Sequence, residues 1–307
     1  MGSAKNTVLG LNIGGTRCSV VVGDVDRKIG DRAEWQSNTH RGPGPMLDDL
    51  LSHAAAILQQ HDDVGACGVT VGGPLDSYKG IVKEPPNLPG WDNIPLTEIV
   101  ESKLGLPVRV EHDATACALA EARWGEGKAA KRLAYFTCGT GFGAGFVFDG
   151  GPYYGAEGYP SDIGHIRLRE DGPVAYGKTG TVEAFCAASA LGRIAAWKFP
   201  DRWPEPPDSE QVATLAAGGD AQARSVIEIN ASAVGEACAL VGDLLHTDLI
   251  VLGSLAQYLG GEWLELVKLH FDRHSHPITR GHCNVVASSL GRSVQEYGAL
   301  AAALRIM

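Results

Sequence analysis

One pattern occurs twice in this chain of 307 residues: a strand-like run, a short glycine-containing turn and a second strand-like run. The first copy is TVLGLNIGGTRCSVVVGDV, residues 7–25, and the second is LAYFTCGTGFGAGFVFDG, residues 133–150. Runs of β-branched and aromatic residues on both sides of a glycine turn are typical of β-hairpins. Because each copy opens one half of the chain, the repeat predicts a duplicated domain with a cleft between the two copies.

Alternating strand and helix patterns follow each hairpin. The first half continues with a helix over about 45–60, the strand patterns ACGVTV and LPVRVEHD, and the helical run DATACALAEARW. The second half contains a helical stretch over about 220–246, the short strand DLIVLGS and the final helix SVQEYGALAAAL. This alternation indicates an α/β fold. We expect an N-terminal lobe of residues 1–115, joined by the C-terminal helix at about 293–307, and a C-terminal lobe of residues 116–292.

Glycine is unusually frequent. The 40 glycines make up about 13% of the chain, against a norm of about 7%. They cluster at residues 10–15, 71–73, 139–145 and 150–158. Clustered glycines are typical of tight turns where the backbone approaches a ligand closely.

Charge and composition exclude several classes of protein. A net charge of −10 without a basic patch argues against a nucleic-acid partner, because such binding depends on cationic side chains. We expect no membrane partner and no signal peptide, because the sequence lacks an apolar run of sufficient length. The seven cysteines are odd in number, lie in apolar runs and form no CxxC motif. They are predicted to be buried reduced thiols of a cytoplasmic protein.

The glycine turns do not match the common nucleotide-binding motifs. Gly139, Gly141 and Ala144 satisfy the spacing G-x-G-x-x-A, but the following GFVFDGGPYY reads as a strand rather than a helix. No Walker-type G-x-x-x-x-G-K-[ST] motif is present. Backbone amides exposed in hairpin turns can still bind a phosphate. Ordinary hairpin turns, which also favour glycine, are the alternative.

Asp113 stands where the strand pattern VRVEH passes into the helix pattern DATACALAEARW. An aspartate at such a junction often caps the helix N-terminus. It can also act as a general base, because ligands of α/β proteins bind at the carboxyl ends of strands. From the local sequence the cap is favoured, although one side chain can serve both roles.

Taken in order, the motifs resemble those of the ROK family of sugar kinases and repressors. LNIGGTR and TCGTGFGAG resemble its two phosphate turns, and VGGPLD and EPPNLPGW its substrate-side signatures. EHDATACALAE resembles the catalytic-aspartate segment, SDIGHIRL the histidine motif, GTVEAF the glutamate motif and IVLGSLA the adenosine loop. The resemblance runs nearly from end to end. It implies a two-lobed actin/hexokinase-like (ribonuclease H-like) α/β fold with an interdomain cleft.

The resemblance also implies roles for individual residues. Asp113 would accept the proton of a sugar hydroxyl as that hydroxyl attacks the γ-phosphate of ATP, with Mg²⁺ bridging phosphate oxygens. The residues implied to line the sugar pocket are Asn87, His112, Asp162, His165 and Glu183. Those implied to hold the nucleotide are Gly14, Gly15, Thr16, Gly139, Thr140, Gly141 and Gly253. No residue is expected to ligate a metal directly.

Each of these residues also has a structural explanation when taken singly. Asp162 and His165 can cap and satisfy a loop, and Glu183 can be a solvated acid in a first helical turn. Asn87, next to prolines, can form an Asx-turn. The histidine-rich HFDRHSHPITRGHC is interpreted as a solvated helix end and loop rather than a metal cluster.

The sequence departs from the family pattern in three respects. Asn12 replaces the aspartate usual in the first phosphate turn, and a neutral amide is a weaker support for Mg²⁺ than a carboxylate. Val174, Tyr176 and Thr181 stand where many members have zinc-binding cysteines, so no structural zinc is expected. His112 stands where an asparagine is usual, and Asp162 where a glutamate is usual.

Three functions are consistent with these features of the sequence. The favoured one is an ATP-dependent kinase for a hexose or hexose derivative, cytoplasmic and homo-oligomeric, with a dimer foremost. A sugar-sensing protein that has lost turnover is supported by Asn12 and opposed by Asp113. A repressor is disfavoured, because a strand expected from about residue 7 leaves no room for an N-terminal helix-turn-helix. The sequence does not identify the sugar or the hydroxyl.

Overall fold

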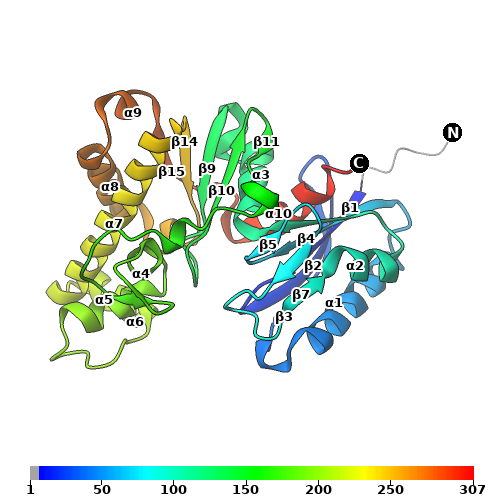
Figure 1. Ribbon diagram of the computed structural model, residues 1–307, viewed down its shortest axis with the longest axis horizontal. Coiled ribbons are helices and arrows are strands. Elements are labelled where there is room, and N and C mark those ends of the chain that lie inside the picture. Colours follow the sequence, from blue (N-terminus) through cyan, green and yellow to red (C-terminus); the bar gives the residue numbers. More distant parts are fainter. Residues whose placement is uncertain (1–6) are drawn as a thin grey trace. The chain divides into compact units, whose positions relative to one another are not determined.

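The computed structural model describes residues 7–307, so the first six residues of the expected N-terminal lobe lie outside the described part. The chain divides into two compact units (Figure 1). The first unit runs through Lys128 and also takes in Gly150–Ser161 and Arg292–Met307. The second consists of Ala129–Asp149 and Asp162–Gly291. The sequence predicts the division at 115/116 instead, 13 residues earlier than Lys128.

The first unit is built on a mixed five-stranded sheet with the order β3-β2-β1-β4-β8. The strand β1 pairs antiparallel with β2 and parallel with β4, which pairs parallel with β8. The predicted first hairpin is therefore confirmed. Its strands have the bounds β1 (Thr7–Ile13), β2 (Arg17–Asp24), β3 (Ile29–Gln36), β4 (Val64–Val71) and β8 (Val108–His112).

Helices cover both faces of this sheet (Figure 1). Because side chains alternate along a strand, Leu9 and Leu11 of β1 share a core with α1 (Pro43–Leu58) and α2 (Leu96–Leu104). The opposite face packs against α10 (Val294–Ala303), which also contacts α3 (Asp113–Trp124). The contact between α3 and α10 explains why the first unit extends past residue 115, and the predicted attachment of the C-terminal helix lies in the same unit.

A buried polar network fastens residues 150–161 to β8. Tyr154 Oη donates a hydrogen bond to Glu111, which is fully buried, and accepts from Arg109 at 2.7 Å and from Arg305 at 2.9 Å. Burial, together with the negative charge of Glu111, raises the pKa of Tyr154 to about 12. Tyr154 therefore stays a neutral donor at physiological pH and holds Glu111.

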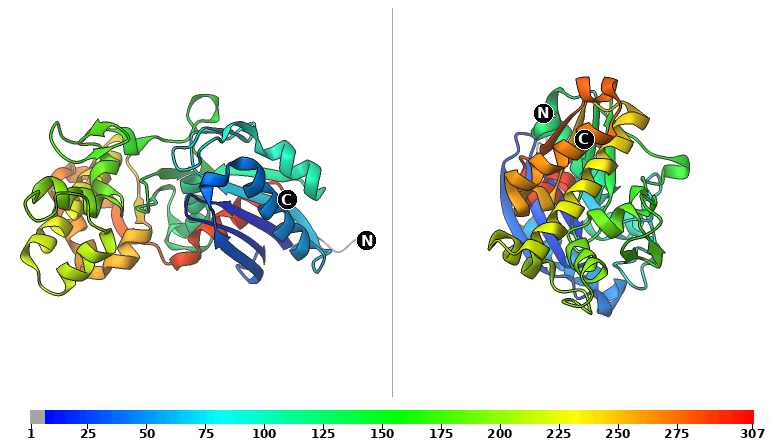
Figure 2. Two further views of the ribbon diagram at one scale, coloured as in Figure 1. Left: turned by 90° about the horizontal axis from the view of Figure 1, so that it is seen from below. Right: turned by 90° about the vertical axis from the view of Figure 1, so that its left-hand side faces the viewer.

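The second unit repeats the strand order of the first. Its sheet contains β10-β9-β14-β15, in which β9 pairs antiparallel with β10 and parallel with β14, and β14 pairs parallel with β15. Figure 2 shows this unit, coloured mainly green to orange, from two further sides. A hairpin followed by two parallel strands is the arrangement β2-β1-β4-β8 of the first unit, as the repeat in the sequence predicts. The strands are β9 (Arg132–Phe136), β10 (Ala144–Phe148), β14 (Leu249–Leu252) and β15 (Asn284–Ala287).

The helices of the second unit share one large apolar core. They are α4 (Val182–Cys186), α5 (Ala190–Lys198), α6 (Ser209–Ala217), α7 (Ala221–Leu245), α8 (Ser254–His274) and α9 (Pro277–His282). The helix α8 contains a kink at Gly260, whose φ is 77°. The helix α7 is long and apolar enough to cross a membrane, contrary to the expectation that no such run exists, but 61% of its most apolar window is buried, as in a core helix.

Short elements complete the two units. The small strands are β5 (Leu75–Asp76), β6 (Ile81–Lys83), β7 (Asp92–Pro95), β11 (Gly151–Pro152), β12 (Val174–Ala175) and β13 (Lys178–Thr179). The 3-10 turns are η1 (Thr39–Arg41), η2 (Glu126–Ala129), η3 (Ala156–Gly158), η4 (Ile163–His165) and η5 (Gly291–Ser293). The histidine-rich segment is expected from its sequence to be a helix end followed by a loop. The loop part of that prediction is wrong, because α9 forms there. All seven cysteines are buried and free, as predicted.

The tight packing of α10 generates a stability prediction. A Cβ on Gly68 would collide with the Ala299 carbonyl oxygen and lie 2.6 Å from the Ala303 nitrogen. We expect Gly68→Ala to destabilise the protein by about 2–3 kcal/mol, as overpacking of a dense core does, measured by urea unfolding. Gly44→Ala in α1 is the matched control, because nothing lies within 4 Å of a Cβ there. An equal unfolding midpoint for both variants would contradict this packing.

Candidate active site

The first glycine turn joins β1 to β2 and is held close to its neighbours. The Gly14 amide donates to the Arg17 carbonyl at 3.1 Å, and a Cβ on Gly14 would lie 2.7 Å from that oxygen. A Cβ on Gly15 would lie 3.0 Å from Asn87 Cβ. Gly15 and Thr16 are exposed. Glycine is required here by close approach, and the turn brings one predicted sugar residue, Asn87, against one predicted phosphate residue, Gly15.

Asn12 is fixed at the end of β1. It is only 7% exposed, and Thr70 on the neighbouring strand donates its hydroxyl to Asn12 Oδ1 at 2.9 Å. The two residues are partners in the parallel register of β1 and β4. An aspartate in this position would accept the same hydrogen bond, so the amide changes the charge of the turn more than its shape.

Asp113 is the first residue of α3, and the N-cap residue is His112. The predicted N-cap at Asp113 is therefore wrong by one residue. The Asp113 Oδ1 accepts from the Ala114 amide at 2.7 Å and lies 3.2 Å from His112 Nε2. The Asp113 side chain is 32% exposed. One carboxylate oxygen is thus held by the protein, and the other remains available to a ligand.

His112 lies beside this carboxylate rather than in solvent. Its residue is 6% exposed, its Nδ1 has no hydrogen-bond partner among the described residues, and a Cβ on Gly73 would lie 3.2 Å from its ring. An imidazole Nε2–H would donate to Asp113 Oδ1 and fix the orientation of the carboxylate. The sequence predicts His112 as a sugar contact, and the geometry adds a contact with Asp113.

The second glycine turn, between β9 and β10, is held by hydrogen bonds within the turn and by one from a neighbouring side chain. The Gly139 amide donates to the Gly141 carbonyl at 3.0 Å. The Gly143 amide donates to Thr137 Oγ1 at 2.9 Å, and Ser189 donates its hydroxyl to the Thr140 carbonyl at 2.5 Å. These bonds fix the turn that the sequence predicts as a phosphate site.

Glu183 lies under this turn, in the first turn of α4. Its Oε2 accepts from the Phe142 amide at 3.1 Å and would lie 3.2 Å from a Cβ on Gly141. Burial raises the pKa of Glu183, against the lowering effects of the Phe142 amide, Arg193, His165 and the Tyr176 hydroxyl. A solvated first-turn acid, the alternative from sequence, is therefore excluded, because the carboxylate is partly buried and hydrogen-bonded.

His165 and Asp162 are both exposed, at the two ends of the η4 turn. Asp162 precedes η4 without a capping hydrogen bond from its side chain. The His165 ring lies 6.3 Å from the Tyr176 ring at an interplanar angle of 19°, and its carbonyl accepts from Lys178 Nζ at 2.5 Å. The hairpin β12–β13 thus packs against the histidine.

The residues in the position of the family's cysteines do not fit zinc. Val174 has no ligating atom, and Thr181 Oγ1 accepts from the Ala184 amide at 3.2 Å as the N-cap of α4. Tyr176 interacts with Glu183 and His165. Over residues 7–307, no group of three or more His, Cys, Asp or Glu side chains could hold a metal ion.

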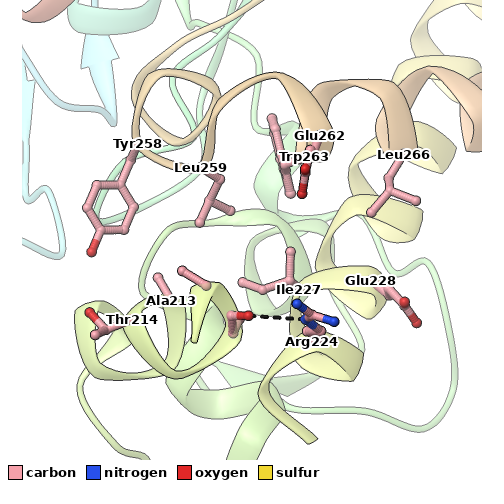
Figure 3. Close-up of a pocket in the computed structure, with 12 residues that line it drawn as sticks. Ala213, Thr214, Arg224, Ile227, Glu228, Tyr258, Leu259, Glu262, Trp263 and Leu266 are labelled. Carbon is pink, nitrogen blue, oxygen red and sulfur yellow. Dashed lines mark hydrogen bonds between the residues drawn. The ribbon is translucent and has the colours of Figure 1, made fainter. Parts of the chain in front are cut away.

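Gly253 joins β14 to α8 beside the second glycine turn. Its amide donates to the Phe136 carbonyl at 2.8 Å, and the Ser254 amide donates to the Thr137 carbonyl at 3.1 Å. A Cβ on Gly253 would collide with the Tyr135 hydroxyl. The first turns of α8 continue from Gly253 to a cavity of about 800 Å³ between α6, α7 and α8 (Figure 3).

Apolar and polar groups both line this cavity. Tyr258 and Leu259 project from α8 toward Ala213 and Thr214 of α6 (Figure 3). Arg224 of α7 donates to the Ala216 carbonyl at 3.2 Å, the bond that Figure 3 marks. The sequence points to Gly253 but not to this cavity, because its walls come from three helices that are distant in the chain.

Comparison with known proteins assigns the chain to a family. The model of the family described as "ROK family" matches residues 8–305. The chain belongs to the ROK family. The resemblance seen in the motifs and the α/β fold it implies are both confirmed.

Relatives in the ROK family differ in function. The chain is 27% identical to a glucokinase of Halalkalibacterium halodurans, over 94% of this chain and 92% of that one. It is 30% identical to an N-acetylmannosamine kinase of Escherichia coli, over 86% and 88%. It is also 27% identical to a xylose repressor of Caldicellulosiruptor bescii, over 73% of this chain and 58% of the repressor.

A solved ROK structure has the same fold. The ROK family glucokinase of Streptomyces griseus, in complex with glucose and AMPPNP, superposes with a TM-score of 0.84 at 27% identity. The match covers 97% of this chain and 99% of that one. The sequence assigns no site role to Thr70, Tyr176, Lys178 and Arg193, nor to Tyr258 and Leu259 of the cavity wall. Tyr176 stands out in the sequence only because many family members have a zinc-binding cysteine there, and nothing in the sequence signals the others.

The buried position of Glu183 generates a pH prediction. Its pKa is higher in the folded protein than in the unfolded chain. Its contribution to stability is therefore complete below the ordinary glutamate pKa of about 4.3 and is lost as the pH rises through the raised value. We expect the melting temperature of wild type relative to Glu183→Gln to fall as the pH rises above about 4. A difference that is constant or rises with pH would contradict the burial of this carboxylate.

Proposed function

We propose that this ROK protein is an ATP-dependent kinase for a hexose or hexose derivative, with Asp113 as the general base. The proposal rests mainly on one observation: one oxygen of Asp113 is held by the Ala114 amide and His112, while the side chain stays one-third exposed at the carboxyl end of β8. Glucokinases and an N-acetylmannosamine kinase among the relatives support the same function.

The proposed reaction is an in-line phosphoryl transfer. The oxygen of a sugar hydroxyl attacks the γ-phosphorus of ATP as Asp113 Oδ2 accepts the hydroxyl proton. The bond between the γ-phosphorus and the β–γ bridging oxygen breaks, and its electron pair leaves with ADP. In such a reaction the protein contributes positioning and charge stabilisation more than covalent chemistry. Oδ1 keeps its two contacts throughout, so the base does not rotate as it accepts the proton.

The nucleotide is assigned to both glycine turns and to the second unit. Gly14, Gly15 and Thr16, with Gly139, Thr140 and Gly141, would hold phosphate oxygens through exposed backbone amides. Gly253 and the first turn of α8 continue from the second turn to the cavity of Figure 3. Its apolar wall, Tyr258 and Leu259, suits the flat face of an adenine, so we assign the adenosine moiety there.

The sugar is assigned to polar side chains of both units. Asn87 beside the first turn, and Asp162, His165 and Glu183 in the second unit, are proposed to pair with sugar hydroxyls. A pocket that pairs hydroxyls responds strongly to small changes of reach. Asp162 is shorter than the glutamate usual in the family, and His112 replaces an asparagine. The identity of the hexose therefore has to be found by experiment.

Magnesium would neutralise the phosphate charge that develops during transfer. In this chain Asn12 stands where a family member usually has the aspartate that supports such an ion. Its oxygen already accepts the Thr70 hydroxyl and carries no charge. The turn is thus compatible with Mg²⁺ but gives it weaker support than an aspartate would.

A sugar-binding protein without turnover is the second candidate function. The neutral Asn12 favours it, and the presence of a xylose repressor among the relatives supports it. A net charge of −10 does not favour a nucleic-acid partner. Seven buried, free thiols agree with a cytoplasmic location. A homodimer is proposed as the assembly.

The role of Asp113 is tested by its variants. We expect wild type to release ADP from Mg-ATP with at least one sugar of a panel that includes glucose and N-acetylmannosamine. Asp113→Asn keeps an oxygen for the Ala114 amide and should lower kcat by about 10²–10⁴-fold, the usual contribution of a general base. Sugar binding, followed by calorimetry, should remain. Sugars that raise the melting temperature of wild type without any ADP release would favour the sensor instead.

The role of Asn12 is tested by restoring the charge. Asn12→Asp should lower the Mg²⁺ concentration required for half-maximal rate several-fold, because a carboxylate is the better support for a hard cation. Thr70→Ser, which keeps the hydroxyl donor, is the control and should leave that concentration unchanged. The same Mg²⁺ requirement in wild type and Asn12→Asp would show that the ion is supported elsewhere.

A further inference from the structure

Tyr176 occupies an unusual backbone position. It forms, with Gly177, the two-residue turn of the hairpin β12–β13, and the φ values of the two residues are 47° and 73°. Positive φ at both central residues defines a type I′ turn, in which Asn-Gly is strongly preferred. A large residue at positive φ is strained. The local structure therefore does not account for a tyrosine there.

The side chain of Tyr176 contacts two residues of the proposed sugar site. Its ring lies nearly parallel to that of His165, with centroids 6.3 Å apart. Its hydroxyl is hydrogen-bonded to the Glu183 carboxylate. Half of Tyr176 nevertheless remains exposed. An aromatic face beside two groups that pair hydroxyls is suited to a sugar ring, whose C–H groups form an apolar face.

Hydrogen bonds connect this hairpin to the residues that precede it in the chain. Lys178 donates to the His165 carbonyl at 2.5 Å, and the Leu168 amide donates to the Gly180 carbonyl at 2.9 Å. Thr181 then caps the helix that carries Glu183. The segment that holds cysteines in many family members is held here by backbone and side-chain hydrogen bonds.

We propose that Tyr176 is a positioning and specificity-determining residue for the sugar, an inference that rests on the proposed function. Its hydroxyl orients the Glu183 carboxylate, its ring restrains His165, and its exposed face contacts the C–H face of a pyranose. Tyr176 thereby fixes the positions of His165 and Glu183 relative to each other.

The effect of the Tyr176 hydroxyl on the pKa of Glu183 can be measured. Arg193 of α5, His165 of η4, the Phe142 amide and the Tyr176 hydroxyl all stabilise the ionised carboxylate against burial. Removing the hydroxyl raises the pKa of Glu183 further. The acidic limb of the pH profile of kcat/KM for the sugar then moves to higher pH.

Two variants separate this role from a structural one. Tyr176→Phe keeps the ring and removes the hydroxyl, and should raise the KM of the best sugar in the panel about 10-fold or more, as loss of a hydrogen bond to a charged group does. Tyr176→Asn removes the ring as well but supplies the residue that type I′ turns prefer. It should raise that KM by more than Tyr176→Phe while the melting temperature stays equal or rises. The KM of ATP and kcat should stay within about twofold in both, because uniform sugar binding is lost.

Val174→Ala, at an exposed position of the same hairpin, is the matched control and should leave every parameter unchanged. If wild type phosphorylates a sugar and both Tyr176 variants keep its KM within twofold, the inference is overturned and the proposed function stands. If wild type binds a sugar without turnover, the kinase proposal fails. The Kd of that sugar then replaces KM, and only a raised Kd in Tyr176→Asn supports the inference. If wild type neither binds nor phosphorylates any sugar, both fail together.

Discussion

The chemistry proposed for this protein depends on the direct passage from β8 into α3. The strand ends at His112 and the helix begins at Asp113, with no residue between them. The Asp113 carboxylate therefore lies at the helix N-terminus, where the helix dipole favours negative charge. Its Oδ1 is used by the Ala114 amide and faces His112. A longer connection would leave both oxygens mobile, and the base would have to be oriented by the substrate.

The end of β8 is held by a buried hydrogen-bond network around Glu111. Glu111, the residue before His112, is fully buried and accepts from the His112 amide at 3.1 Å. It also receives the Tyr154 hydroxyl, while Arg109 and Arg305 supply compensating charge. Removing one partner of such a buried group leaves an uncompensated charge, which is strongly destabilising. The network thus links residues 150–161 and the C-terminus to the position of the carboxylate proposed as the general base.

In the second unit, one carboxylate connects the two substrates of the proposed reaction. Glu183, which is proposed to bind the sugar, accepts from the amide of Phe142, the residue after Gly141 of the proposed phosphate turn. A change in the position of α4 is therefore transmitted to the turn through a single hydrogen bond. The Tyr176 hydroxyl contacts the same carboxylate on the sugar side.

Much of the fold could be predicted from the sequence, because its signals are local. The two hairpins, the helix DATACALAEARW and the buried thiols all follow from periodicity and composition. The extent of the first unit did not follow, because it depends on the packing of α3 against α10, which are far apart in the chain.

The site was predictable in its motifs but not in its details. Asp113 could be singled out, yet its place as N1 rather than N-cap depends on the φ and ψ of His112. Tyr176 could not be assigned a role, since a type I′ turn is signalled by Asn-Gly and not by Tyr-Gly. The cavity between α6, α7 and α8 could not be foreseen, because helix packing alone creates it.

A crystal structure of the protein with its sugar and a non-hydrolysable ATP analogue tests the central claim most directly. The account predicts that Asp113 Oδ2 lies within hydrogen-bond distance of the sugar hydroxyl that faces the γ-phosphate in line, and that both glycine turns contact the phosphates. A complex in which Asp113 is remote from the sugar, or in which either glycine turn is remote from the phosphates, would contradict it.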